Sequence, residues 1–142
     1  MARSAPPVGL IHSETILVDE GLTVPHVAAA FGGFRDMPRV FATAYLVGFA
    51  EATCIAALKP YLGPDEKTVG IHIDISHSAA TPAGMSVTAK VELIAVEGRR
   101  LRFRVECRDD DEVIGAGHHD RAIIDVAKFE ARVAAKAAKR RA

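Results

Sequence analysis

The feature that most constrains this chain is an apolar segment of 19 residues from Val40 to Leu58, in which Glu51 is the only charged residue. Alanine and leucine favour a helix here, and Pro60 stops the pattern just beyond it. A helix that is apolar on all sides must be wrapped on most of them. A carboxylate at its centre then loses water, which is costly unless partners compensate. We therefore expect Glu51 to have a functional role.

Composition narrows the class of protein. The chain has 142 residues, 49% of them hydrophobic, which is enough for one globular domain. A net charge of zero argues against nucleic acid as a partner. The central glutamate and the absence of a flanking aromatic belt argue against a membrane span. The N-terminus has no apolar signal region, and Cys54 and Cys107 lack metal-binding spacing, so we predict a cytoplasmic protein with reduced thiols.

Strand-like alternation of apolar and polar residues fills much of the remaining sequence. The predicted strands are Gly9–Val18, Val69–His77, Met85–Val96, Leu101–Cys107 and Val113–Asp125, and Val126–Arg141 is predicted as a closing helix. The segment Val24–Met37 is less regular. Pro25 could begin a short helix over Val27–Phe31, and the segment suits a lid or pocket wall, although ordinary core packing explains it equally well.

The order of these elements predicts the fold. One strand, a long apolar helix and four consecutive strands joined by short turns favour antiparallel neighbours. We predict an α+β hotdog fold, in which a five-stranded antiparallel sheet wraps one long apolar helix and a C-terminal helix follows. The expected organisation is a flexible N-terminus over 1–8, a single domain over 9–135 and a basic tail over 136–142.

Two further residues, His77 and Thr43, could form a catalytic group with Glu51. His77 shares the parity of the isoleucines in its strand and is expected to face the helix, where it could form an acid–base pair with Glu51 or a purely structural hydrogen bond. Thr43 lies eight residues before Glu51, or about 12 Å along a helix. Thr43 must therefore either precede the helix and curl back or join the Glu51 of another subunit, unless it is a plain N-cap.

Glycines and histidines in the strands offer further candidates. Gly70, Gly115 and Gly117 permit either close approach of a ligand or a β-bulge. His118 and His119 are neighbours on one strand and face opposite sides, so they cannot easily share a metal ion. We predict that the protein holds no metal.

Several motifs resemble the fluoroacetyl-coenzyme A thioesterase family of hotdog proteins. They are Val40-Phe-Ala-Thr43, Glu51-Ala-Thr-Cys54, Gly70, His77-Ser-Ala-Ala-Thr-Pro-Ala-Gly84, Val96-Glu-Gly-Arg-Arg100, and Ile114-Gly-Ala-Gly117 with His119 and Arg121. The resemblance spans about Gly9 to Val133. It implies an acyl-CoA thioesterase without a cofactor, with catalytic Thr43, Glu51 and His77 and with Gly70 and Arg121 near the site. It also implies a homodimer whose active sites lie at the subunit interface.

The lid region departs from this family in one position. Phe34 matches one lid aromatic, but Met37 stands where the family's best-known member has a phenylalanine. This change bears on fluoroacetyl selectivity rather than on thioester hydrolysis. The alternative function is a non-catalytic hotdog protein that binds an acyl thioester or another apolar ligand. A dehydratase on the same fold is a third possibility.

Overall fold

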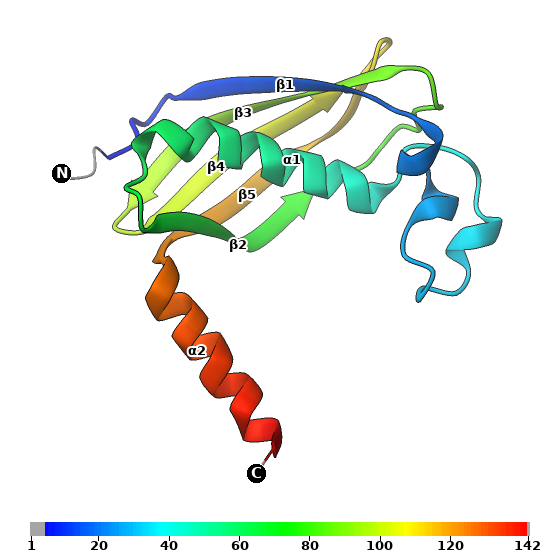
Figure 1. The fold of residues 1–142 in the computed structure, drawn as a ribbon. Coiled ribbons are helices and arrows are strands. Elements are labelled where there is room, and N and C mark those ends of the chain that lie inside the picture. The colour runs from blue at the N-terminus through cyan, green and yellow to red at the C-terminus, as the bar shows by residue number, and fades with distance from the viewer. Residues whose placement is uncertain (1–4, 142) are drawn as a thin grey trace.

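The computed structural model describes residues 5–141, which form one five-stranded antiparallel sheet and two α-helices. The strand order is β1-β3-β4-β5-β2. Figure 1 shows the sheet curving around α1, while α2 projects from the end of β5. The predicted α+β hotdog fold is confirmed. The elements are β1 (Ile11–Leu17), α1 (Thr43–Leu58), β2 (Glu66–Ile75), β3 (Ser86–Glu97), β4 (Arg100–Arg108), β5 (Val113–Asp125) and α2 (Val126–Ala138).

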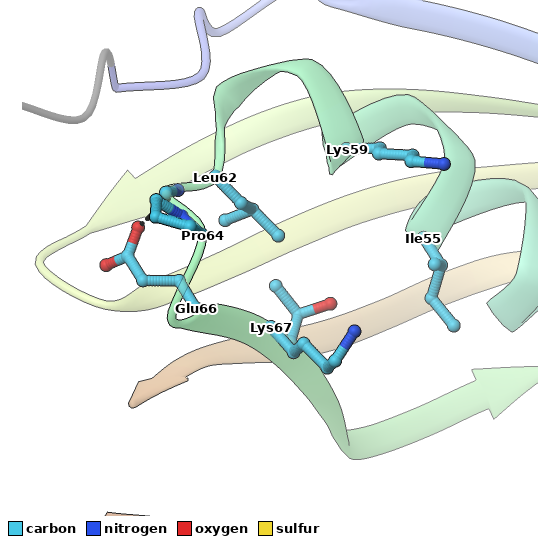
Figure 2. A pocket seen from close by; sticks show the side chains of 8 residues that line it. Ile55, Lys59, Leu62, Pro64, Glu66 and Lys67 are labelled. Carbon is cyan, nitrogen blue, oxygen red and sulfur yellow. Dashed lines mark hydrogen bonds between the residues drawn. The ribbon is translucent and has the colours of Figure 1, made fainter. Parts of the chain in front are cut away.

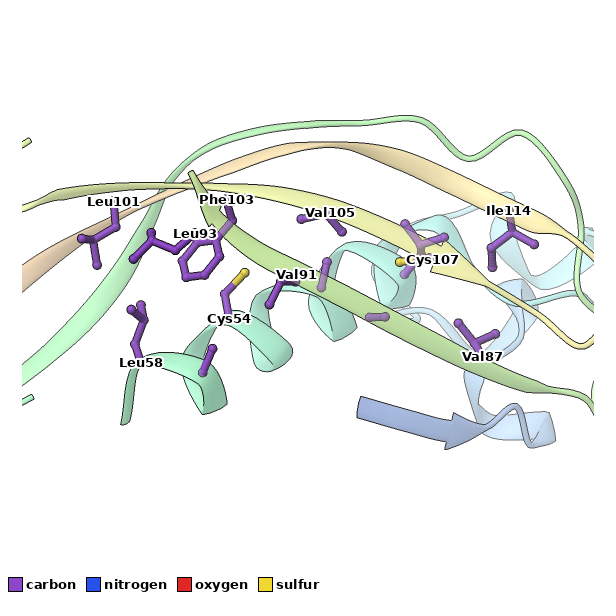
Figure 3. Packing of buried hydrophobic residues seen from close by; sticks show 14 of the residues in the cluster. Cys54, Leu58, Val87, Val91, Leu93, Leu101, Phe103, Val105, Cys107 and Ile114 are labelled. Carbon is purple, nitrogen blue, oxygen red and sulfur yellow. The ribbon is translucent and has the colours of Figure 1, made fainter. Parts of the chain in front are cut away.

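The core lies between α1 and the central strands of the sheet (Figure 3). Alternate residues of β3 and β4 point inward and are fully or almost fully buried, as the alternation predicted. They meet the side of α1 that carries Leu46, Ala50, Cys54 and Leu58. The opposite side of α1 is open in the single chain, where Ala44, Gly48, Ala52 and Ile55 are exposed. In a single chain the helix is therefore covered on most sides and open along this one stripe.

The position of β2 differs from the prediction. Short turns favoured four consecutive strands that pair in sequence order, but β2 pairs with β5 at the far edge of the sheet instead of with β3. Residues 76–85 connect β2 to β3, and Pro82 within this crossover forms an isolated β-bridge with Val40. Strand β2 thus has one free edge, and Ile71 and Ile73 on it are exposed.

A β-bulge in β2 changes which residues face the helix. The register against β5 shifts between Gly70, which pairs with Arg121, and His72, which pairs with Asp120. Directly paired residues share a face, so Gly70 lies on the same face as Arg121. Ile73 lies on that face too, opposite His119, although strict alternation would place Gly70 and Ile73 on opposite faces. Simple alternation along the strand does not predict this.

Gly115 and Gly117 of β5 lie where the neighbouring backbone leaves no room for a side chain. A Cβ at Gly115 would lie 2.2 Å from the carbonyl oxygen of Ser76, and one at Gly117 would lie 1.9 Å from that of Asp74. These two glycines therefore allow the backbones of β2 and β5 to approach each other closely.

Two local features before and at the start of α1 differ from the expected ones. Helix α1 begins at Thr43 because Val40 and Phe41 form β-bridges. No helix forms over Val27–Phe31; instead the region has 3₁₀ turns at Val24–His26 and Phe34–Asp36. Further 3₁₀ turns cover Glu20–Leu22, Lys59–Tyr61 and Lys139–Arg141.

The predicted terminal segments lie partly outside the described residues, which exclude 1–4 and 142. Helix α2 continues without a break from the predicted domain into the predicted basic tail. Among residues 5–141, no helix is long and apolar enough to cross a membrane.

Candidate active site

Thr43 and His77 form a hydrogen-bonded pair at the start of α1. The Thr43 hydroxyl lies 2.7 Å from Nδ1 of His77. Thr43 is the first residue of α1, and His77 follows the end of β2, so the pair joins the helix to the crossover segment. The ring of Phe41 packs edge-on against the imidazole with centroids 6.4 Å apart.

The environment of His77 favours a neutral imidazole. Burial lowers the pKa of His77, and the backbone of Ala79 offsets this effect in part. Its Nε2 atom is buried, and within the described part of the chain no group hydrogen-bonds to it. A buried polar atom without a partner is uncommon, so this nitrogen is available to a ligand or to another molecule.

Glu51 belongs to a second cluster, two turns farther along α1. Its Oε1 accepts a hydrogen bond from Nη1 of Arg121 at 3.0 Å. The Arg121 side chain is only 4% exposed, whereas that of Glu51 is 39% exposed. The carboxylate is therefore less buried than the apolar sequence around it suggested. It has kept access to solvent on one side and gained a buried cation on the other.

Arg121 is fixed by Thr68 and His119, and this role was not predicted for either residue. Its Nε donates to the Thr68 hydroxyl and its Nη2 donates to the Thr68 carbonyl, both at 2.8 Å. Its Nη1 also lies 3.1 Å from Nε2 of His119. His119 was considered as a metal ligand and appeared in a family motif without a role, and no signal in the sequence identified Thr68. Both residues act through the long-range pairing of β2 with β5.

Gly70 lines the Glu51 cluster by lacking a side chain. A Cβ there would lie 2.6 Å from Oε1 of Glu51, 3.2 Å from Cε1 of His119 and 3.4 Å from Nη1 of Arg121. The glycine therefore leaves the space in which the Glu51 carboxylate sits. This explains physically why a glycine suits that position.

Two clefts open between α1 and β2. One, of about 450 Å³, is lined by Val47, Glu51, Gly70, Ile71, His72, Ile73 and His119. The other, of about 500 Å³, lies toward the C-terminal end of α1 (Figure 2). Figure 2 shows Ile55 of α1 and Lys59, which directly follows α1, on one side of it and Lys67 of β2 on the other. The Glu51 carboxylate is thus accessible from a cleft large enough for a small ligand.

One chain does not bring all the predicted catalytic residues together. Thr43 and Glu51 are both helical and lie about 12 Å apart along α1. Since Thr43 does not precede the helix and curl back, the first of the two geometries considered for it is not found. Among residues 5–141, no hydrogen bond or ion pair links Glu51 to His77.

The predicted lid residues lie in the segment before α1. Phe34 is half-buried and packs edge-on against Phe31 at 5.9 Å between centroids. Met37 is exposed and ends the Phe34–Asp36 turn. The Tyr45 hydroxyl ties α1 to this segment by donating to the carbonyl of His26. The segment is therefore adjacent to the end of α1 that carries Thr43. No group of three or more histidine, cysteine or acidic residues in the described chain could hold a metal.

Comparisons with known proteins agree with this architecture. The sequence model of the family described as fluoroacetyl-CoA-specific thioesterase (FlK) matches residues 22–127. The fluoroacetyl-CoA thioesterase of Streptantibioticus cattleyicolor is 43% identical over 129 residues, which are 91% of this chain and 93% of that protein. A structure of the fluoroacetyl-CoA thioesterase FlK matches with a TM-score of 0.90 at 41% identity, covering 94% of this chain and 98% of that one. A Thermus thermophilus member of the thioesterase superfamily matches with a TM-score of 0.85 at 25% identity, covering 95% and 96%.

Proposed function

This chain belongs to the family of fluoroacetyl-CoA-specific thioesterases, and we propose that it hydrolyses a small acyl-CoA thioester to the free acid and coenzyme A. The observation that carries the proposal is the Glu51 carboxylate, which lies at the wall of a cleft and is held by the buried Arg121. The overall reaction consumes water, breaks the acyl carbon–sulfur bond and releases a thiol. It requires no cofactor beyond the coenzyme A of the substrate.

Glu51 supplies the attacking group in this proposal. Its carboxylate either attacks the thioester carbonyl carbon itself or removes a proton from the water that does so. Arg121 holds this carboxylate in the space beside Gly70. Rapid quenching followed by mass spectrometry of the intact protein separates the two routes, because only direct attack adds the mass of the acyl group to the chain.

Thr43 and His77 act on the other side of the reacting group. With the Thr43 hydroxyl donating to Nδ1, the neutral imidazole carries its proton on Nε2, the nitrogen that has no partner among the described residues. That N–H is suited to donate to the departing sulfur. Thr43 then orients the ring or holds the attacking group, and backbone N–H groups in the first turn of α1, which has no side-chain cap, stabilise the developing oxyanion.

We propose a homodimer, because it would bring the Glu51 cluster of one chain close to the Thr43–His77 pair of the other. An exposed apolar edge strand is a ready site for pairing with another chain, and β2 presents Ile71 and Ile73 along such an edge. Antiparallel pairing of two β2 strands about Ile73 sets residue 70 of one copy opposite residue 76 of the other. The Glu51 cluster of one copy would then lie beside the Thr43–His77 pair of its partner, so each active site would use both chains.

The dimer is tested with two isoleucine variants of similar exposure on opposite edges of the sheet. Ile73 on β2 is 43% exposed and Ile11 on β1 is 52% exposed. Ile73→Glu should convert the protein to a monomer in sedimentation experiments and abolish turnover, whereas Ile11→Glu should do neither. A wild-type protein that is monomeric at assay concentrations and fully active would contradict the shared site.

Thioester hydrolysis is tested by measuring free thiol released from acetyl-, fluoroacetyl-, longer-chain and aryl-CoA. Glu51→Gln keeps the shape of the side chain but removes its charge, and it should lower kcat by about 100-fold or more. Glu130→Gln, on the exposed surface of α2, is the matched control and should leave kcat unchanged. Binding of acyl-CoA without thiol release from any substrate would favour the non-catalytic alternative.

The lid bears on which acyl group is preferred. Fluoroacetyl selectivity, the property named for the relatives, would be reduced by Met37, because its flexible side chain replaces a rigid aromatic ring. Met37→Phe should therefore raise the ratio of kcat/KM for fluoroacetyl-CoA to that for acetyl-CoA. An unchanged ratio would show that Met37 does not set the selectivity.

A further inference from the structure

The ring of His119 has a tautomer that its neighbours determine. Its Nδ1 lies 2.7 Å from the carbonyl oxygen of His72, which can only accept a hydrogen bond. Its Nε2 lies 3.1 Å from Nη1 of Arg121, which can only donate. Both contacts are satisfied by one neutral form, with the proton on Nδ1 and a lone pair on Nε2.

The surroundings of His119 maintain this neutral form. The residue is 2% exposed on β5, between Phe103 of β4 and Ile73 of β2. Burial lowers the pKa of His119, the positive charge of Arg121 lowers it further, and the His72 carbonyl, Glu51 and Asp120 act in the opposite direction. A protonated ring would present an N–H to the guanidinium and lose the contact between Nε2 and Nη1.

Arg121 uses four of its five N–H groups in the contacts already described. Two go to Thr68, one to Nε2 of His119 and one to Oε1 of Glu51. Thr68 therefore fixes one side of the guanidinium and His119 fixes the other. The direction of the remaining Nη1 hydrogen, which points at the carboxylate, depends on both.

His119 makes no hydrogen bond to Glu51. The distance from its Nε2 to Oε1 of Glu51 is 3.8 Å, which is too long for one. The hydrogen bonds that link His119 to the carboxylate therefore run through Arg121. The same chain of contacts begins at the carbonyl of His72, just after the bulge in β2, so it ties the carboxylate to the strand that lines the cleft.

We propose that His119 is a positioning residue, which accepts a hydrogen bond from Arg121 and so holds the Glu51 carboxylate in the orientation that attack on the thioester requires. This inference rests on the proposed thioesterase function. It goes beyond that function by assigning a role to a buried histidine that makes no hydrogen bond to the carboxylate.

Two amide variants separate the two hydrogen bonds of the ring. In His119→Gln the amide oxygen can reach the place of Nε2 and accept from Arg121. In His119→Asn the shorter amide can reach the place of Nδ1 and donate to His72, but it cannot reach Arg121. Positioning predicts that Asn lowers kcat by about 10- to 100-fold with KM changed less than about threefold, while Gln retains at least about a third of wild-type kcat. His118→Asn, the neighbour on the other face, is the control and should resemble wild type.

A double-mutant comparison excludes a merely structural role. With Glu51 already replaced by Gln, His119→Asn should cause no further loss of residual activity, because there is no carboxylate left to orient. A full additional loss, or equal losses in the Gln and Asn variants, would overturn the proposal.

A measurement without turnover distinguishes this inference from the proposed function. Long-range proton–nitrogen NMR spectra report which ring nitrogen of His119 carries the hydrogen, whether or not the protein is an enzyme. The proposal requires the Nδ1–H form at pH 7.5, and in the Arg121→Leu variant the Nε2 signal should shift. A ring protonated on Nε2, or on both nitrogens, would overturn it even if thiol release confirms the thioesterase.

Discussion

Replacement of Gly70 by alanine tests the active-site geometry most directly. The added Cβ would lie 2.6 Å from Oε1 of Glu51, closer than real Cβ contacts allow. Gly70 does not have a positive φ, so its backbone accepts alanine without strain. The carboxylate must therefore move from 2.6 Å to the 3.4 Å of ordinary contact, a displacement of about 0.8 Å.

The consequences for stability and for catalysis should differ in size. The Glu51 side chain is partly exposed and can rotate away, at a cost of about 0.5–1.5 kcal/mol. Loss of glycine entropy in the unfolded state offsets about 0.4–1 kcal/mol of that, so stability should change by less than about 1 kcal/mol. The displacement would lengthen the 3.0 Å bond to Arg121, and a misplacement of this size lowers kcat by about 100-fold, or about 2.7 kcal/mol of transition-state stabilisation.

The experiment combines urea unfolding with thiol release for three glycine variants. Gly48→Ala lies on the exposed side of α1, where a Cβ meets nothing within 4 Å, and it should stabilise the protein slightly. Gly115→Ala places a Cβ 2.2 Å from backbone and should prevent folding. Gly70→Ala should fold and lose activity. Full activity in Gly70→Ala, or its failure to fold like Gly115→Ala, would refute the reasoning.

Three further predictions concern stability and reactivity. Burial raises the pKa of Cys54 to about 12 and that of Cys107 to about 11, so a thiol reagent at pH 8 should label neither until denaturant unfolds the chain. The pKa of His77 is lowered in the folded protein, so the unfolded state binds a proton on this residue more tightly than the folded state does. The neutral His77 therefore contributes fully to stability above about pH 6.5, and this contribution is lost as the pH falls. Between pH 7.5 and 5.5 the wild-type midpoint of thermal unfolding should therefore fall more than that of His77→Gln, and an equal fall would contradict this. Thr81→Val removes the buried hydroxyl that donates to Asp109 at 2.8 Å and should lower the free energy of unfolding by about 1–3 kcal/mol in urea titrations.

Sequence patterns predicted the elements of the fold well for a physical reason. Alternation with a period of two reports which residues face a core, and β5 runs from Val113 to Asp125 as expected. An apolar run without breakers reports a helix, and α1 ends at Leu58 as expected. Both signals are local, because each is produced by the geometry of one element.

The sequence by itself therefore determined the strands, the apolar helix and the acidic residue at its centre. Only the tertiary structure decided that β2 pairs with β5, that a bulge turns Gly70 toward the helix, and that Arg121 and His119 reach Glu51 while His77 meets Thr43. Pairing between distant strands and a one-residue shift of register are set by contacts across the whole chain. No local pattern of residues encodes them.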